Sequence, residues 1–132
     1  MRSGAARIFL ATGALLLAAG TAIGAVAAHS LKVSWSAEQL AVVHTALLYQ
    51  FVHSLGLLAI GLLLAHFDSA AVRAAGWLVT AGIILFCGSL YLLAAGVHGM
   101  GIATPVGGLS LILGWVVLAA AMLRRPPAAQ SR

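Results

Sequence analysis

The chain has 132 residues, of which 63% are hydrophobic and 7% are charged. Soluble domains carry about 25% charged residues, and a chain this short would leave much apolar surface in water, so the composition excludes a soluble globular protein and indicates an integral protein of a lipid bilayer. The net charge of +5 comes from scattered basic residues rather than from a basic stripe, which argues against nucleic-acid binding.

Four apolar segments of about 19 to 24 residues follow one another, and each is long enough to cross a bilayer as a helix. They cover residues 8–28, 42–65, 74–97 and 105–123. We therefore predict an all-α membrane protein in which residues 1–123 form a single domain, a four-transmembrane-helix bundle. The basic tail, residues 124–132, contains two adjacent prolines and is expected to be disordered.

The first segment has a second interpretation as a secretory signal peptide, because Arg2 and Arg7 precede the apolar run and residues 25–27 read Ala-Val-Ala. The apolar run is longer than the roughly 7–15 residues usual in such peptides, which favours an uncleaved helix. Gly20 and Gly24 are four residues apart and present one small-residue face for contact with another helix.

The second segment combines a helix start with polar residues near its middle. Ser36 and Gln39 have the spacing of a capping box. Tyr49, Gln50 and His53 are three or four residues apart and therefore share a helix face. Polar side chains at this depth are costly, so they need partners or a function.

The third segment supplies the expected partners, since Tyr91 and Ser89 lie at about the depth of His53 if the two helices pack antiparallel. We predict an intramembrane polar network of Tyr49, Gln50, His53, Ser89 and Tyr91. The network is either a set of hydrogen bonds that fixes the bundle or part of a proton or solute path. No second histidine lies at the depth of His53, which argues against bis-histidine haem, and no cofactor is expected.

The fourth segment begins with Thr104 and Pro105, and this pair predicts the helix start because threonine caps helices and proline presets the backbone angle of the first turn. Gly107 and Gly114 are one heptad apart and are expected in a helix contact, as is Gly88 of the third segment.

Charges in the connections predict the orientation. An even number of crossings places both chain ends on one side, where the sequence has Arg2, Arg7, Arg73, Arg124, Arg125 and Arg132; the other side has only Lys32. Because short loops rich in Lys and Arg stay inside the cell, we predict a bacterial inner-membrane protein with both termini in the cytoplasm.

Three histidines, His29, His44 and His98, fall near the opposite, periplasmic surface together with Glu38. Imidazoles and a carboxylate are ligands for zinc or copper, so these residues are the candidates for a metal or redox site. Histidines are also at home in the interfacial zone without a ligand, and no paired metal-binding spacing is present. We therefore expect no metal.

Several short motifs occur in order along the chain. They are Gly-Ala-Val-Ala-Ala-His at 24–29, Tyr-Gln-Phe-Val-His at 49–53, Gly-Ser-Leu-Tyr at 88–91, Thr-Pro-Val-Gly-Gly at 104–108 and Gly-Trp at 114–115. The set resembles the YgdD-like family of small bacterial inner-membrane proteins, whose function is not established. Val26 and Ala27 depart from the Phe and Gly of the family pattern. The resemblance implies four membrane helices and an uncleaved first span, and it implies no activity.

The sequence contains no Ser-His-Asp arrangement, no paired carboxylates and no phosphate-binding glycine loop followed by lysine, so no catalysis is expected. We predict a structural, assembly or interaction role, with a membrane protein or a second copy of the chain as partner. The first alternative is a small transport or permeation module built on Tyr49, Gln50, His53 and Tyr91. The second is the periplasmic histidine site.

Overall fold

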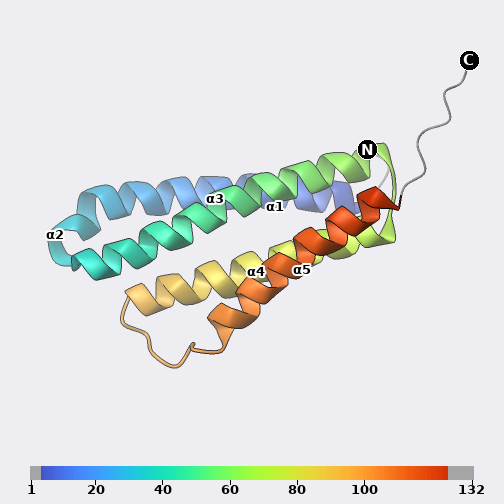
Figure 1. The fold of residues 1–132 in the computed structure, drawn as a ribbon. Coiled ribbons are helices and arrows are strands. Elements are labelled where there is room, and N and C mark those ends of the chain that lie inside the picture. The colour runs from blue at the N-terminus through green and yellow to red at the C-terminus, as the bar shows by residue number, and fades with distance from the viewer. Residues whose placement is uncertain (1–3, 125–132) are drawn as a thin grey trace, which may run out of the picture.

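The computed structural model describes residues 4–124. Its elements are α1 (Gly4–Val26), the π-helical turn η1 (Ala27–Leu31), the short α2 (Lys32–Ser34), α3 (Ala37–His66), α4 (Ala70–Ala94) and α5 (Ala103–Leu123) (Figure 1). The tail that we expected to be disordered, residues 124–132, lies outside the described residues except for Arg124.

Four helical stretches of the described chain are long and apolar enough to cross a membrane, which confirms the predicted number and type of spans. They are Gly4–Ser34, which joins α1, η1 and α2, then Ala37–His66, Ala70–Ala94 and Ala103–Leu123. The first two stretches exceed the apolar segments predicted from the sequence, because a helix continues through interfacial residues until its backbone groups find another partner.

Caps set the start of α3 and the end of α4. The predicted capping box is present, since Ser36 Oγ accepts from the Gln39 N–H at 3.1 Å and Gln39 Oε1 accepts from the Ser36 N–H at 2.9 Å. At the end of α4, Gly96 has a φ of +84°, and the Val97 N–H donates to the Leu92 carbonyl. This left-handed glycine ends the helix three residues before the predicted position, 97.

The predicted start of the fourth helix, with Thr104 as the cap and Pro105 as the first helical residue, is wrong by two residues. The helix begins at Ala103, and Ile102 occupies the N-cap position without a side-chain cap. Thr104 does not cap α5, because its hydroxyl lies 2.7 Å from Ser89 Oγ on α4. Pro105 still fits the first turn, where the N–H that proline lacks would have had no helical partner.

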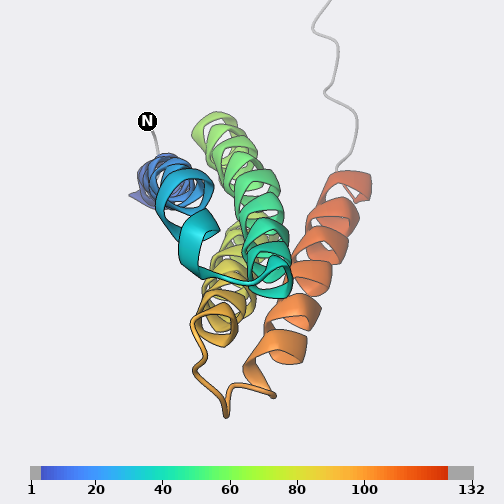
Figure 2. The same cartoon turned by 90° about the vertical axis from the view of Figure 1, so that its left-hand side faces the viewer.

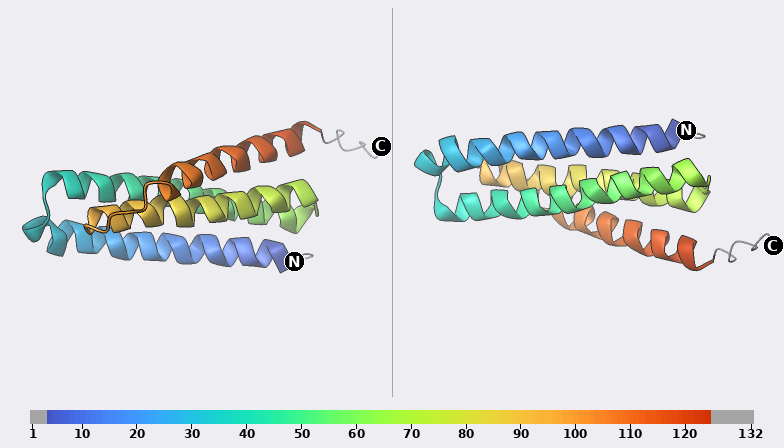
Figure 3. Two further views of the ribbon diagram at one scale, coloured as in Figure 1. Left: turned by 90° about the horizontal axis from the view of Figure 1, so that it is seen from below. Right: turned by 90° about the horizontal axis from the view of Figure 1, so that it is seen from above.

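The helices α3 and α4 form the centre of the molecule, and α1 and α5 flank this pair on opposite sides (Figure 2). The buried share of each apolar stretch follows the same order: 50% in α3, 33% in α4 and 17% in each of the flanking helices. Figures 1 and 3 show that the start of α1 and the end of α5 lie at one end of the molecule. The other end holds η1, α2 and the α4–α5 connection.

Glycines bring α4 and α5 together. A Cβ atom added to Gly107 would overlap the backbone of Phe86, and one added to Gly114 would lie 2.7 Å from Val79 Cγ2. Close contacts of the same kind occur at Gly76 and Gly82, which lie in the predicted small-residue stripe of the third span, and at Gly13, Gly56 and Gly61, which no such stripe marks. Van der Waals packing of this kind drives helix association in lipid, where no hydrophobic effect acts between helices.

The other three glycines expected in helix contacts differ from one another. A Cβ atom on Gly20 would lie 3.2 Å from Gln50 Nε2, which is a tight contact, and one on Gly24 would lie 3.7 Å from Leu47 Cδ1, which is an ordinary contact. At Gly88 an added Cβ would meet nothing within 4 Å. The expectation that Gly88 lies in a helix contact is therefore wrong, because no neighbouring helix comes within contact distance of this position.

This difference gives a matched pair of variants. Gly107→Ala is expected to lower the stability of the protein in detergent by about 1–3 kcal/mol, the usual cost of overpacking, because the backbone of Phe86 cannot move aside cheaply. Gly88→Ala is expected to leave the stability unchanged or to raise it, since alanine favours a helix over glycine by about 0.5–1 kcal/mol. Thermal unfolding of both variants measures the difference, and an equal loss in both would contradict the α4–α5 contact.

Candidate intramembrane polar site

Gln50 lies at the centre of the polar site and joins three helices. Its side chain is 4% exposed on α3. Nε2 donates to the Leu16 carbonyl oxygen of α1 at 2.8 Å, and Oε1 accepts from the Tyr91 hydroxyl of α4 at 2.7 Å. Gly20 makes room for the amide on the α1 side. One side chain therefore satisfies its own polar atoms and ties α1 and α4 to the central helix.

His53 does not join this chain of hydrogen bonds. Its Nδ1 lies 2.7 Å from the Tyr49 carbonyl oxygen one turn earlier, and because a carbonyl can only accept, this bond places a proton on Nδ1. The Tyr49 ring stacks on the imidazole with a centroid distance of 5.7 Å, and the Trp115 ring of α5 lies at 6.0 Å. His53 is 7% exposed and contacts both aromatic rings.

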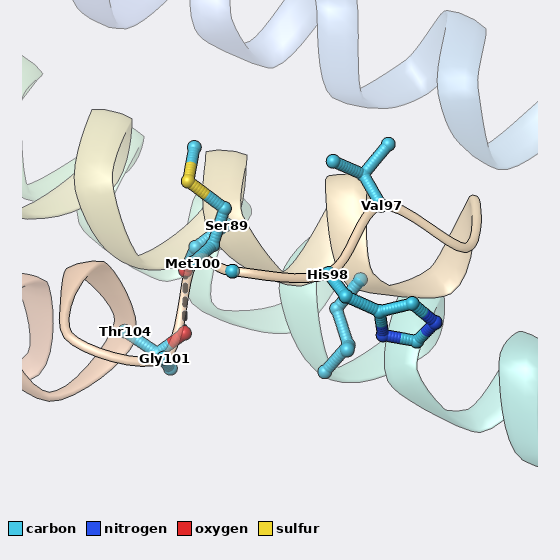
Figure 4. A pocket seen from close by; sticks show the side chains of 8 residues that line it. Ser89, Val97, His98, Met100, Gly101 and Thr104 are labelled. Carbon is cyan, nitrogen blue, oxygen red and sulfur yellow. Dashed lines mark hydrogen bonds between the residues drawn. The ribbon is translucent and has the colours of Figure 1, made fainter.

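Ser89 binds α5 rather than α3. Its hydroxyl donates to the Phe86 carbonyl oxygen at 2.9 Å and lies 2.7 Å from Thr104 Oγ1 (Figure 4). Since the single Ser89 proton is used on Phe86, Thr104 must be the donor in the second bond. The two hydroxyls line a cavity of about 180 Å³ beside the α4–α5 connection, which also contributes His98 and Met100.

The five residues predicted to form one network therefore fall into three groups. Tyr91 and Gln50 form a hydrogen-bonded pair, Tyr49 and His53 form a stacked pair, and Ser89 belongs to the α4–α5 contact. Tyr91 meets the predicted polar face at Gln50, whereas Ser89 does not reach that face and the His53 Nδ1–H donates to a carbonyl of its own helix.

Two more side chains, Gln39 and Ser110, join helices through backbone carbonyls, a role that was not predicted for them. Gln39 Nε2 donates to the Ala94 carbonyl oxygen at 2.9 Å, and Ser110 Oγ donates to the Leu78 carbonyl oxygen at 2.7 Å. The capping-box spacing marked Gln39, but it only accounts for the Oε1 atom of this amide. No sequence pattern marks the receiving carbonyls.

The hollow beside His53 is formed by α3 alone. It has a volume of about 220 Å³ and is lined by Leu48, Tyr49, Val52 and His53. Leu48 and Val52 are exposed on the outer face of α3. The hollow therefore opens sideways, toward the hydrocarbon region expected around an apolar helix, rather than toward an end of the bundle.

The three histidines predicted for the periplasmic surface are exposed and come from three different elements. His29 lies in η1, His44 in α3 and His98 in the α4–α5 connection. Within residues 4–124, no group of three or more His, Cys, Asp or Glu side chains is placed to hold a metal ion. Both acidic residues lie outside the middle of the helices: Glu38 is in the first turn of α3, and Asp68 forms an ion pair with Arg73.

Comparison with known proteins places the chain among membrane proteins. Residues 23–108 match the family model described as protein of unknown function (DUF423). A UPF0382 membrane protein of Staphylococcus epidermidis is 43% identical over 121 residues, which cover 89% of this chain and 97% of the relative. The UPF0382 membrane protein YwdK of Bacillus subtilis is 34% identical over 120 residues, which cover 89% and 98%. No solved structure matches the chain.

The Gln50 contacts can be tested by a double-mutant cycle. Tyr91→Phe removes one interhelical hydrogen bond, and the expected loss of stability is about 0.6–2 kcal/mol. Gln50→Leu removes the bonds to both α1 and α4 and is expected to cost more. Unfolding of both variants and of the double variant in detergent measures the coupling. If Tyr91→Phe destabilises the Gln50→Leu protein as much as it destabilises the unmodified chain, the bond does not exist in solution.

Proposed function

The chain belongs to the family described as protein of unknown function (DUF423), and we propose that it serves the membrane as a structural, assembly or interaction component without catalysis. The observation that carries this proposal is the Gln50 amide, both ends of which are bound within the protein. A catalytic or substrate-binding amide needs a free end, whereas this one is used to hold helices together.

The surroundings of His53 favour this role over transport. A solute or proton path needs polar surface that continues from one end of the bundle to the other. The imidazole instead contacts the rings of Tyr49 and Trp115, and Gly56 allows the Trp115 ring to pack closely against α3. The hollow that reaches His53 opens on the outer face of α3.

We further propose that the protein lies in the bacterial inner membrane with both termini in the cytoplasm. Arg7, Arg73 and Arg124 belong to the end of the molecule where α1 starts and α5 ends, whereas Lys32 belongs to the opposite end. The positive-inside rule supports a cytoplasmic location for the arginine-bearing end.

We also propose that the YgdD-like proteins are relatives of this chain. The short motifs that occur in the same order along the sequence support this relationship. The same motifs include the residues that bind across helices, Gln50 and Tyr91, and the Gly107 contact. The relationship therefore implies a shared helix-packing scheme and no activity.

Cysteine labelling tests the orientation. Val33, which is 88% exposed in α2, and Ala70, at the exposed start of α4, lie at opposite ends of the molecule. In a Cys87→Ala background, a membrane-impermeant maleimide added from the periplasmic side is expected to modify Val33→Cys and to spare Ala70→Cys. The reverse labelling pattern would invert the proposed topology.

Purification from native membranes tests the functional role. We expect the tagged chain, extracted in a mild detergent, to elute as a complex with a second copy or with another membrane protein, because an assembly role requires a partner. Light scattering gives the mass of the protein part. A protein part equal to one chain would contradict the assembly role.

Reconstitution of the same protein into vesicles provides the control against transport. Vesicles loaded with a pH-sensitive dye are expected to leak protons no faster than protein-free vesicles. A proton flux that His53→Gln abolishes would overturn the structural proposal and establish the transport alternative.

A further inference from the structure

A pocket of about 290 Å³ lies at the end of the bundle that holds η1 and α2, away from the polar site. It is lined by Ala27, Ala28, Lys32, Leu40 and His44, and we call it the Lys32–His44 pocket. Two of its side chains carry nitrogen and the other three are apolar. The pocket thus combines a cationic or hydrogen-bonding rim with an apolar wall.

The π-helical turn explains why Lys32 faces this pocket. The Lys32 N–H donates to the carbonyl oxygen of Ala27, five residues earlier. In an α-helix a residue five positions ahead is rotated by about 140° from the first, whereas the wider π turn brings the two nearly above one another. Lys32 therefore lies over Ala27, and the small side chains of Ala27 and Ala28 leave space beneath it.

The charge of Lys32 has no acidic partner in the described structure. Lys32 is the single lysine of the chain. Within residues 4–124 the one ion pair joins Arg73 to Asp68 at the other end of the molecule. The nearest acidic residue in the sequence, Glu38, forms no ion pair with Lys32 or His44. An anion bound at the pocket would therefore not compete with a carboxylate.

The pocket lies along α3 near the level at which the helix leaves the hydrocarbon core and enters the lipid headgroups. α3 has 30 residues and is therefore about 45 Å long, which exceeds the hydrocarbon core by about 15 Å. The first turns of α3 thus reach the headgroup region, and His44 lies about 10 Å from Ala37 along the axis. The long lysine side chain can place its ammonium group at the same level.

We propose that the Lys32–His44 pocket binds the phosphate of an anionic phospholipid. The Lys32 ammonium neutralises the phosphate charge, and the His44 ring donates a hydrogen bond to a phosphate oxygen. Leu40, Ala27 and Ala28 contact the glycerol and the first methylene groups of the acyl chains. The apolar wall selects a lipid over free phosphate, because inorganic phosphate gains nothing from it.

Lipid retention on the full-length protein tests this proposal. The protein is extracted from vesicles of phosphatidylcholine doped with phosphatidylglycerol, and native mass spectrometry counts the lipids that remain bound. We expect preferential retention of one phosphatidylglycerol, which Lys32→Gln weakens about fivefold, since one basic residue near an anionic surface contributes about that factor. His44→Gln is expected to weaken retention further in the same direction, and Lys32→Arg is expected to preserve it.

Arg7→Gln is the matched control, because Arg7 is also exposed but lies at the opposite end, where it lines a separate, more open hollow. It is expected to leave the retained phosphatidylglycerol unchanged. Equal retention by Lys32→Gln and the unmodified chain would overturn the proposal. An equal loss in Arg7→Gln would also overturn it, since the effect would then reflect overall charge. Displacement of the lipid by inorganic phosphate would assign the site to a free anion instead.

Discussion

The hydrocarbon region offers no water to a buried amide, and the arrangement of α1, α3 and α4 depends on how the Gln50 side chain meets this constraint. Its donor is used on a carbonyl of α1 and its acceptor on a hydroxyl of α4. Each bond is worth little by itself, but removal of either helix would leave a polar atom without a partner. The amide therefore specifies which helices are neighbours as well as adding stability.

The contact between α4 and α5 uses a different device. Gly107 and Gly114 let the two backbones approach closely, and Ser110 then reaches the Leu78 carbonyl across the interface. The hydrogen bond depends on the close approach, because a short hydroxyl side chain reaches a neighbouring backbone only when the helices nearly touch. α5 is consequently held to α4 along this interface and contacts α3 at Trp115, whereas α1 is held through the Gln50 amide and its own glycine contacts.

The sequence predicted the spans, the Ser36–Gln39 cap and the helix face shared by Tyr49, Gln50 and His53, because all three follow from hydropathy and helical spacing. It did not predict the partner of each polar group. Spacing fixes the direction of a side chain around its own helix, but the partner depends on the neighbouring helix and on competing carbonyls. The Tyr49 carbonyl accepts the hydrogen bond from His53, and the Tyr91 hydroxyl donates its hydrogen bond to Gln50. The prediction of a helix contact at Gly88 was wrong for a related reason: a small residue permits a close contact, but the contact also needs an opposing helix at that position.

Ser54 shows that close packing takes priority over polarity in this bundle. Among the described residues its Oγ is the one buried side-chain oxygen or nitrogen without a hydrogen bond, a condition that costs about 1–3 kcal/mol. The Ser54 carbonyl oxygen would lie 2.8 Å from a Cβ atom on Gly13, so α1 and α3 meet here almost backbone to backbone. Such a contact leaves little room for side chains near it, and the short Ser54 side chain is fully buried. At the α1–α3 interface, Gln50 thus contributes a hydrogen bond, whereas Ser54, one turn later on α3, contributes close packing without one.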